Sequence, residues 1–188
     1  MKLVITGNPG VGKHTSAKLI AKKLGAEIID INRVAQAREV ITAKTDRGLD
    51  VDVKKLKGLI GRALASKSRA IVVGHLAPYV VKRTDIEMVA VLRRSPYALE
   101  KTLERRKYSY AKVRENVASE ILGVSMYDAI KAFGKAKVAE FDTTQKSPEQ
   151  TATEIIKTLQ GKLTKKTGRV DWLSLVSEKD DVKHFFEY

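Results

Sequence analysis

A glycine-rich loop near the start of the sequence carries the residues best suited to bind phosphate. The stretch GNPGVGKHT, residues 7–15, follows a short apolar run and precedes a helical pattern. Glycines let the backbone curl so that successive N–H groups point at one anion. The start of the next helix adds unpaired donors and the positive end of its dipole, and Lys13 adds a mobile positive charge. This strand, loop and helix predict a phosphate-binding P-loop.

Several loop positions are candidates for contacts with ATP and its magnesium ion. The motif is G-x-x-x-x-G-K, and His14 stands where Ser or Thr is usual. His14 can donate to phosphate, but it cannot ligate Mg²⁺ as a hydroxyl does. Thr15 offers a hydroxyl to a phosphate or to the metal. The expected ATP contacts in the loop are Gly10, Val11, Gly12, Lys13, His14 and Thr15.

Further polar residues follow the other predicted strands. Five short apolar runs alternate with helical patterns, at residues 2–6, 26–30, 70–73, 86–92 and 137–141. This alternation predicts a three-layer α/β fold with a five-stranded parallel sheet. Ligands in such sheets bind beyond the carboxyl ends of the strands. The residues expected at that edge are Asp30, His75, Arg93, Asp142, Thr143 and Thr144.

The chemistry of these residues suggests a role for each. Asp30 can hold Mg²⁺ through water or orient a second substrate, although it can equally cap a helix. His75 can point at the γ-phosphate or at an attacking water, although a buried, hydrogen-bonded histidine is the alternative. Arginine binds phosphate oxygens with a planar fork that keeps its charge, and Arg106 is preferred over Arg105 for this. Asn32, Arg33 and Arg93 are placed with Asp30 at the second substrate, and Asp142 to Thr144 at the base of ATP.

The remaining patterns place the helices and divide the chain. Helical spacing is found at residues 16–24, 32–40, 53–65, 96–105, 111–133 and 149–159. Residues 42–50 are polar and predict a mobile loop. Residues 1–162 are expected to form one domain. Residues 163–188 form a tail that either packs an apolar strip on the outer helices or docks a partner.

Composition limits the function classes. The 188 residues include no cysteine, and their formal net charge is +14. Disulfides and cysteine-based zinc sites are therefore excluded. We expect a cytoplasmic protein, because no signal segment precedes the first strand and no apolar run is long enough for a membrane span. The charge indicates nucleotides, RNA or a ribonucleoprotein as partners, or simply a heavily charged surface.

At this point the sequence resembles a known family. The loop has the form G-x-P-G-x-G-K-x-T of nucleoside-monophosphate kinases. The stretches GHLAPYV, LRRSP, ERRKYSYAKVRENVASE, FDTT and GRVDWLSLV are similar to one branch, the adenylate-kinase-like ATPases typified by the coilin-interacting nuclear ATPase protein and its archaeal relatives.

The resemblance implies a function and a site. It implies Mg²⁺-dependent transfer of phosphate from ATP to AMP and other monophosphates, ATP hydrolysis, and a role in maturation of the small ribosomal subunit. The protein would act as a monomer. Its partners would be a platform ribosomal protein, pre-ribosomal particles and rRNA. It also implies a monophosphate-binding region near residues 30–53 and a lid near residues 105–115. The implied ATP contacts are Gly10, Gly12, Lys13, His14, Thr15 and Arg106.

The sequence departs from the family pattern at three positions. His14 replaces the usual Thr, Val73 stands in place of a Walker B Asp, and Lys107 replaces a lid-hinge Gly. The first two departures remove side chains that usually hold Mg²⁺. Together with the third, they affect the rate of catalytic turnover that the resemblance implies. Two alternatives therefore stay open: an ATP-dependent ribosome-assembly factor with little kinase activity, and a kinase for a sugar or a shikimate-like metabolite.

Overall fold

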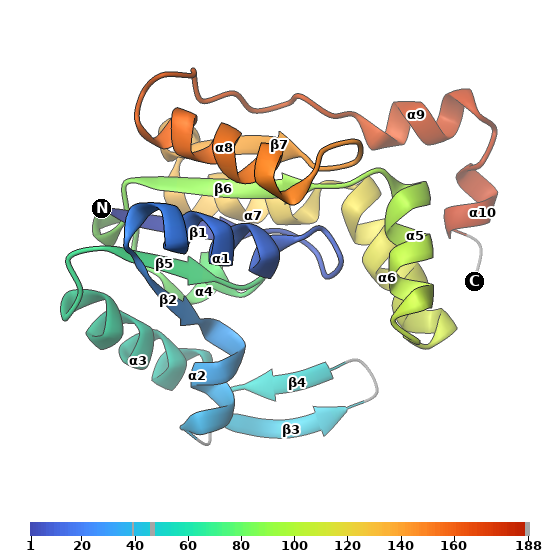
Figure 1. Cartoon of the computed structure of the whole chain (residues 1–188). Coiled ribbons are helices and arrows are strands. Elements are labelled where there is room, and N and C mark those ends of the chain that lie inside the picture. Colours follow the sequence, from blue (N-terminus) through green and yellow to red (C-terminus); the bar gives the residue numbers. More distant parts are fainter. Residues whose placement is uncertain (39, 46–47, 187–188) are drawn as a thin grey trace.

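A parallel sheet forms the centre of the protein (Figure 1). The computed structural model describes residues 1–38, 40–45 and 48–186. Its main sheet has five strands in the order β2-β5-β1-β6-β7, all parallel, as the sequence predicted. The strands are β1 (Lys2–Thr6), β2 (Glu27–Asp30), β5 (Ala70–Val73), β6 (Met88–Arg93) and β7 (Val138–Asp142). The inner strands β1, β5 and β6 are built mainly of buried apolar residues, because both faces of the sheet are covered.

Helices cover the two faces of the sheet and create two cores. Alternate residues of β1 face opposite sides, so Leu3 and Ile5 enter one core and Val4 enters the other. The first core lies under α1 (Lys13–Leu24), α5 (Pro96–Arg105), α6 (Tyr110–Ile121) and α8 (Pro148–Leu159). The second lies under α2 (Ile31–Ala37), α3 (Val53–Ala65), α4 (Ala77–Val80) and α7 (Val124–Phe133). Short 3₁₀ turns are found at η1 (Arg83–Asp85) and η2 (Lys135–Lys137).

The predicted long helix over residues 111–133 is wrong, because the chain breaks at Gly123. Gly123 has a φ of +67° and separates α6 from α7. A left-handed backbone ends a helix and suits glycine. The break lets α6 pack in the first core with α5, whereas α7 packs under β6 in the second core. One periodic segment therefore serves both faces of the sheet.

The predicted loop over residues 42–50 is also wrong in its described part. Here β3 (Ile41–Thr45) and β4 (Gly48–Val51) pair antiparallel in a separate hairpin, and residues 46 and 47 lie outside the described residues. The hairpin is closed at its base by Asp52 N–H, which donates to the carbonyl of Val40 at 2.8 Å. Val40 is buried in the second core, which anchors this end of the hairpin. The preceding helix ends at Ala37, before residue 40.

The tail crosses the molecule and returns to α5 and α6. Residues 161–171, here called the strap, lead into α9 (Trp172–Glu178) and α10 (Val182–Phe186). The side chains of Trp172, Val176 and Phe185 are buried in the first core, and both tail helices contact α6. Figure 1 shows them beside α5 and α6. None of the described helices has the length and apolar character needed to span a membrane.

Candidate nucleotide site

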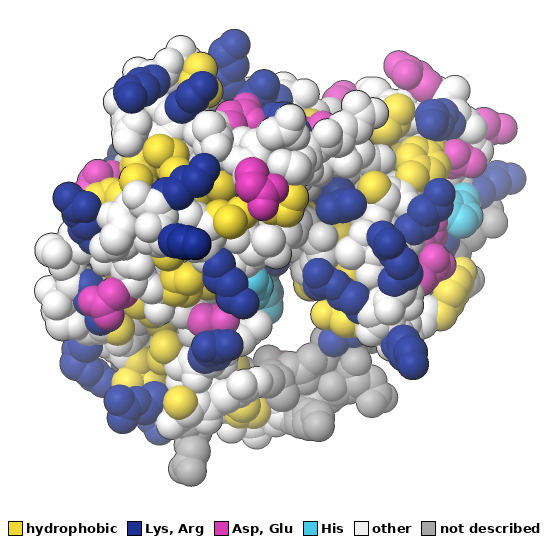
Figure 2. All heavy atoms as spheres, viewed as in Figure 1, with side chains coloured by type: hydrophobic (Ala, Val, Ile, Leu, Met, Phe, Trp, Pro, Cys, Tyr) yellow, Lys and Arg dark blue, Asp and Glu magenta, His cyan; other side chains and the backbone are white. Residues whose placement is uncertain are grey.

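The P-loop opens into the larger of two described cavities. This cavity has a volume of about 530 Å³ and lies between the loop, α2, the loop after β5 and helix α6. Figure 2 shows the surface hollowed between the body of the protein and the helices α5 and α6. The predicted residues that line it are Gly10, Gly12, Lys13, His14, Thr15, Asn32, His75 and Arg106.

The loop backbone forms the floor of the cavity. Gly10 and Gly12 have φ values of +90° and +94°, a left-handed backbone that side chains disfavour. A side chain on Gly10 would also come within 2.7 Å of the Leu99 side chain. The space before Gly12 is open, since an added Cβ would meet nothing within 4 Å. Val11 is buried, and its carbonyl accepts from the Thr143 hydroxyl at 3.2 Å. The loop therefore offers backbone N–H groups, and it fits a polyphosphate.

Lys13 provides the positive charge beside this loop. Its Nζ donates to the carbonyl oxygen of Asn8 at 2.8 Å, and among the described ion pairs none joins Lys13 to a carboxylate. Burial lowers the pKa of Lys13 to about 8, with Arg106 acting in the same direction and Glu120 and Asp30 opposing it. Its charge is therefore available to an anionic ligand.

His75 faces the cavity from the end of β5. Its ring is open to the cavity, yet the surrounding walls partly remove it from water. This desolvation, followed by the charges of Lys13 and Lys112, lowers the pKa of His75 to about 4. His75 is therefore neutral at pH 7 and can accept a hydrogen bond from water through one ring nitrogen. It cannot pair with a phosphate as a cation.

Asp30 lies beside the cavity, and its carboxylate oxygens contact neighbouring residues. Its Oδ1 accepts from the backbone N–H groups of Asn32 and Arg33 at 3.0 and 3.3 Å, which caps α2. Its Oδ2 lies 3.1 Å from Nε2 of His14. Asp30 thus occupies the helix-capping role that the sequence left open.

The described side chains fit a magnesium ion that arrives on the phosphates. No group of three or more His, Cys, Asp or Glu residues is arranged to hold a metal in the described part of the chain. Val73, at the usual acidic position, is buried and paired with Ile5 in the sheet. Mg²⁺ keeps several waters and is commonly held through substrate phosphates. The hydroxyl of Thr15 is the predicted protein ligand that lines the cavity.

Residues of α5 and α6 form the opposite wall of the cavity. Arg106 closes the C-terminal end of α5 and lines the cavity. Arg105 instead turns its Nε to the carbonyl of Lys101 at 3.1 Å. Sequence reasoning missed further lining residues on and near α6, which recur at helical spacing within the ERRKYSYAKVRENVASE stretch. These are Tyr108, Lys112, Glu115, Asn116 and Ser119.

Several predicted residues do not reach the cavity. The guanidinium of Arg93 is buried, with 4 % of its surface exposed, and binds the carboxylates of Glu120 and Glu140. It also donates to the main-chain carbonyl of Glu120 at the end of α6, where a cation is favoured. The structure therefore contradicts the prediction that Arg93 binds substrate, because its donors are taken up by these partners.

The residues predicted at the base of ATP are bound within the loop after β7. The carboxylate of Asp142 accepts from the N–H and hydroxyl of Thr144, and the Thr144 oxygen accepts from Ser95 N–H at 2.8 Å. The Thr143 hydroxyl is buried against main-chain carbonyls of the P-loop and β6. Arg33 is exposed on α2. None of these residues lines the cavity, and the Thr143 hydroxyl supports the P-loop through its bond to the Val11 carbonyl.

Fold and site together define a P-loop protein of the nucleotide-kinase type. Residues 3–123 match a family described as AAA domain, AAA_18. The chain is 35% identical over 178 residues to the "Putative adenylate kinase" of Thermococcus gammatolerans, covering 95% of this chain and 96% of that one. It is 34% identical over 175 residues to the protein of the same name from Methanocaldococcus jannaschii, covering 92% and 93%. The chain belongs to this adenylate-kinase-like P-loop family.

Solved structures support the fold. A shikimate kinase from Aquifex aeolicus superposes with a TM-score of 0.55 at 16% identity, covering 86% of this chain and 98% of that one. The YorR protein of Bacillus subtilis, solved with phosphorylated GDP, gives 0.61 at 16% identity, covering 86% and 97%. At this identity the likeness concerns the fold alone.

Proposed function

We propose that this protein is a nucleoside-monophosphate kinase that transfers the γ-phosphoryl group of ATP to AMP and, with broad specificity, to other monophosphates. The observation that carries the proposal is a cavity of about 530 Å³ with Lys13 and the P-loop on one side and Arg106 on the other. The archaeal relatives named for adenylate kinase activity support the choice of AMP.

In the proposed reaction an oxygen of the AMP phosphate forms a bond to the γ-phosphorus. The bond between that phosphorus and the β–γ bridging oxygen breaks, and two molecules of ADP result. The P-loop amides and Lys13 hold the transferred group, and Arg106 offsets its charge. The attacking oxygen is already anionic, so no protein base is needed. Bound Mg²⁺ would supply further charge neutralisation on the phosphates.

The proposal includes a slower hydrolysis of ATP. When water replaces AMP, neutral His75 can accept a hydrogen bond from it and orient it toward the γ-phosphorus. His75 suits this because its lowered pKa, about 4, leaves a ring nitrogen free of a proton at pH 7. ATPase and kinase activity would then share the P-loop and differ in the nucleophile.

The kinase proposal is tested by measuring ADP formation from ATP with and without AMP. We expect AMP to stimulate turnover, and Lys13→Ala to lower it by roughly 10²- to 10³-fold, as for other lost charge-stabilising donors. Lys18→Ala, which removes an exposed lysine of the same helix, should leave turnover unchanged. Equal ADP formation with and without AMP would contradict the proposal.

We also propose that the protein acts in the cytoplasm as a monomer during maturation of the small ribosomal subunit, contacting a platform ribosomal protein and rRNA. The net charge of +14 supports a polyanionic partner, and Figure 2 shows Lys and Arg side chains spread over the visible face. A factor with weak or no kinase activity is the alternative form of this proposal.

This second proposal predicts recovery of small-subunit components from a ribosome-assembly extract. Binding dominated by rRNA phosphates should fall steeply with salt, whereas binding to a ribosomal protein should fall less. Lys13→Ala serves as the matched variant, because it separates nucleotide-dependent recovery from the effect of surface charge. An extract that yields no ribosomal component at moderate salt would refute the proposal.

A further inference from the structure

The buried carboxylate of Glu120 joins the P-loop to the C-terminal tail. Glu120 lies near the end of α6 and is fully buried. It accepts from Nδ2 of Asn8 and from Nε of Arg93, both at 2.7 Å, and from the N–H of Arg94 at 3.1 Å. The indole Nε1 of Trp172, the first residue of α9, donates to it at 3.1 Å. A loop residue and a tail residue thus share one acceptor group.

Asn8 carries this connection into the nucleotide site. Its side-chain oxygen accepts from the hydroxyls of Ser119 and Ser125, each at 3.2 Å. Its main-chain carbonyl accepts from Nζ of Lys13 at 2.8 Å. Asn8 is buried, and these partners hold its side chain and its carbonyl. A shift of Glu120 would therefore move Asn8, and with it the loop and the resting place of Lys13.

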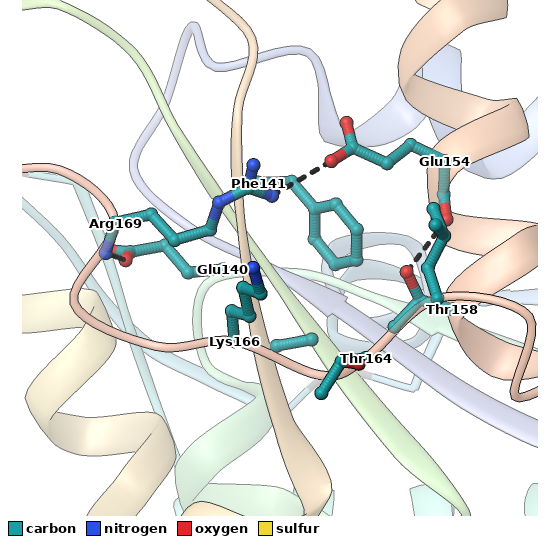
Figure 3. Close-up of a pocket in the computed structure, with 9 residues that line it drawn as sticks. Glu140, Phe141, Glu154, Thr158, Thr164, Lys166 and Arg169 are labelled. Carbon is teal, nitrogen blue, oxygen red and sulfur yellow. Dashed lines mark hydrogen bonds and ion pairs between the residues drawn. The ribbon is translucent and has the colours of Figure 1, made fainter.

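The tail holds the same cluster at a second point. Arg93 bridges Glu120 to Glu140 of β7, which its Nη1 contacts at 2.8 Å. The other oxygen of Glu140 accepts from the backbone N–H of Arg169 in the strap. Figure 3 shows Arg169 between Glu140 and Glu154, at a cavity of about 200 Å³. The strap therefore donates to the buried carboxylate of Glu140, and α9 donates to that of Glu120.

The local geometry makes the tail donors matter. Arg93 is the cation that bridges the two carboxylates, and N–H donors help to satisfy the remaining lone pairs of Glu120 and Glu140. Loss of the Trp172 donor leaves Oε1 of Glu120 with Nε of Arg93 and the N–H of Arg94, so a buried carboxylate loses one of its charge-assisted hydrogen bonds. A carboxylate that has lost this donor can shift toward Arg93 and Arg94, and the shift reaches Asn8 through the bond to the other carboxylate oxygen.

We propose that Glu120 is a positioning residue for the P-loop, which it reaches through Asn8, and that the indole of Trp172 holds the Glu120 carboxylate in place. Docking of the tail and binding of nucleotide then strengthen each other. Such coupling is reciprocal: bound nucleotide holds Asn8 and Glu120, and a held Glu120 retains the indole. This inference rests on the proposed function only in that a nucleotide binds at the loop. It does not require that AMP is phosphorylated.

The test compares two tail-contact variants in the full chain. Trp172→Phe keeps an aromatic ring and removes the N–H donor. Tyr97→Phe is the matched control, because it removes the tail hydrogen bond from Tyr97 to Asp181, 2.7 Å long, which does not touch Glu120. Calorimetric titration should show ATP binding about threefold to tenfold weaker for Trp172→Phe. Tyr97→Phe should bind within about twofold of wild type.

A spectroscopic readout gives an independent check in the unaltered protein. The sequence has one tryptophan, so its emission reports this contact alone. ATP should change the emission of Trp172 with the same midpoint as the calorimetric binding curve. In Glu120→Gln the change should be smaller at saturating ATP, because the link is weakened.

Two results would overturn the proposal: wild-type affinity in Trp172→Phe, or unchanged wild-type emission at saturating ATP. If ATP binding and emission respond as expected and AMP is not phosphorylated, the kinase proposal fails and the coupling stands.

Discussion

Among single residues, Lys13 gives the site its clearest pH dependence. Burial lowers its pKa to about 8 from the ordinary 10.5, so the free protein loses this positive charge as the pH rises through about 8. Phosphate favours the protonated form, so ATP affinity should fall between about pH 8 and pH 10. Calorimetric titrations across this range would measure the fall, with proton uptake appearing as a buffer-dependent heat.

Lys13→Arg is the variant that isolates this effect. Arginine keeps its charge throughout the range, so its ATP affinity, although weaker, should vary little with pH. The same slope in Lys13→Arg as in wild type would assign the pH dependence to another group.

His75 should separate hydrolysis from transfer to AMP. Its pKa of about 4 makes it neutral from about pH 5 upward, so it adds no inflection to the rate near pH 6.5. His75→Ala should lower ATP hydrolysis by about 10²-fold, the usual size of a lost acid–base or orienting group, and affect phosphorylation of AMP far less. His184→Ala, which alters an exposed tail histidine paired with Glu100, is the control. An equal loss in both reactions would indicate a role in ATP binding.

Arg93 and Asp30 mark the limit of what the sequence could indicate at this scale. Their places at strand ends were predictable from the apolar runs before them. The local capping bonds of Asp30 were an open alternative in the sequence, but the partners of Arg93 could not be predicted, because Glu120 and Glu140 lie 27 and 47 residues from it in sequence. A basic residue after a buried strand can face a ligand or a buried carboxylate, and only the packed helices decide which.

The turn between α5 and α6 contains a residue with a strained backbone. Lys107 has a φ of +58°, a left-handed backbone that costs a non-glycine residue roughly 1–2 kcal/mol. Lys107→Gly removes that cost and adds about 0.5–1 kcal/mol of unfolded-state freedom. The net gain in the free energy of unfolding is about 0 to 1.5 kcal/mol, which should raise the thermal midpoint by up to about 6 °C.

Differential scanning calorimetry of Lys107→Gly would measure this gain. Lys101→Gly, at an exposed position inside α5, should lose about 1 kcal/mol because its backbone is helical. A lowered midpoint in Lys107→Gly would show that the turn is not strained.

The arrangement of α6 and α7 shows why helical periodicity alone was not enough to predict where a helix ends. Apolar spacing continues through residues 111–133 because both α6 and α7 pack on the sheet, although on opposite faces. Next to the break at Gly123, the Arg93 guanidinium donates to the main-chain carbonyl of Glu120 at the end of α6. In the same way, the strands β3 and β4 lack an apolar run and pair mainly with each other.

For the whole molecule, the alternation of short apolar strands with helices was sufficient to predict the parallel sheet. It also predicted that the P-loop and His75 lie at one edge, because carboxyl ends of parallel strands meet there. The tail could not be placed in this way. Its apolar residues indicated packing, but the bonds of Trp172 and Arg169 to buried carboxylates depend on three-dimensional contacts.

The strap has a further consequence that concerns solubility. β7 is the outermost strand on its side of the sheet, and its Glu140 N–H donates to the carbonyl of Lys166 at 2.8 Å. An uncovered edge strand can pair with a strand of another molecule and begin aggregation. Because the strap occupies this hydrogen-bonding position, release of the tail would leave backbone groups of β7 unpaired and open to another strand. The segment that contacts the buried carboxylates therefore also guards the sheet against self-association.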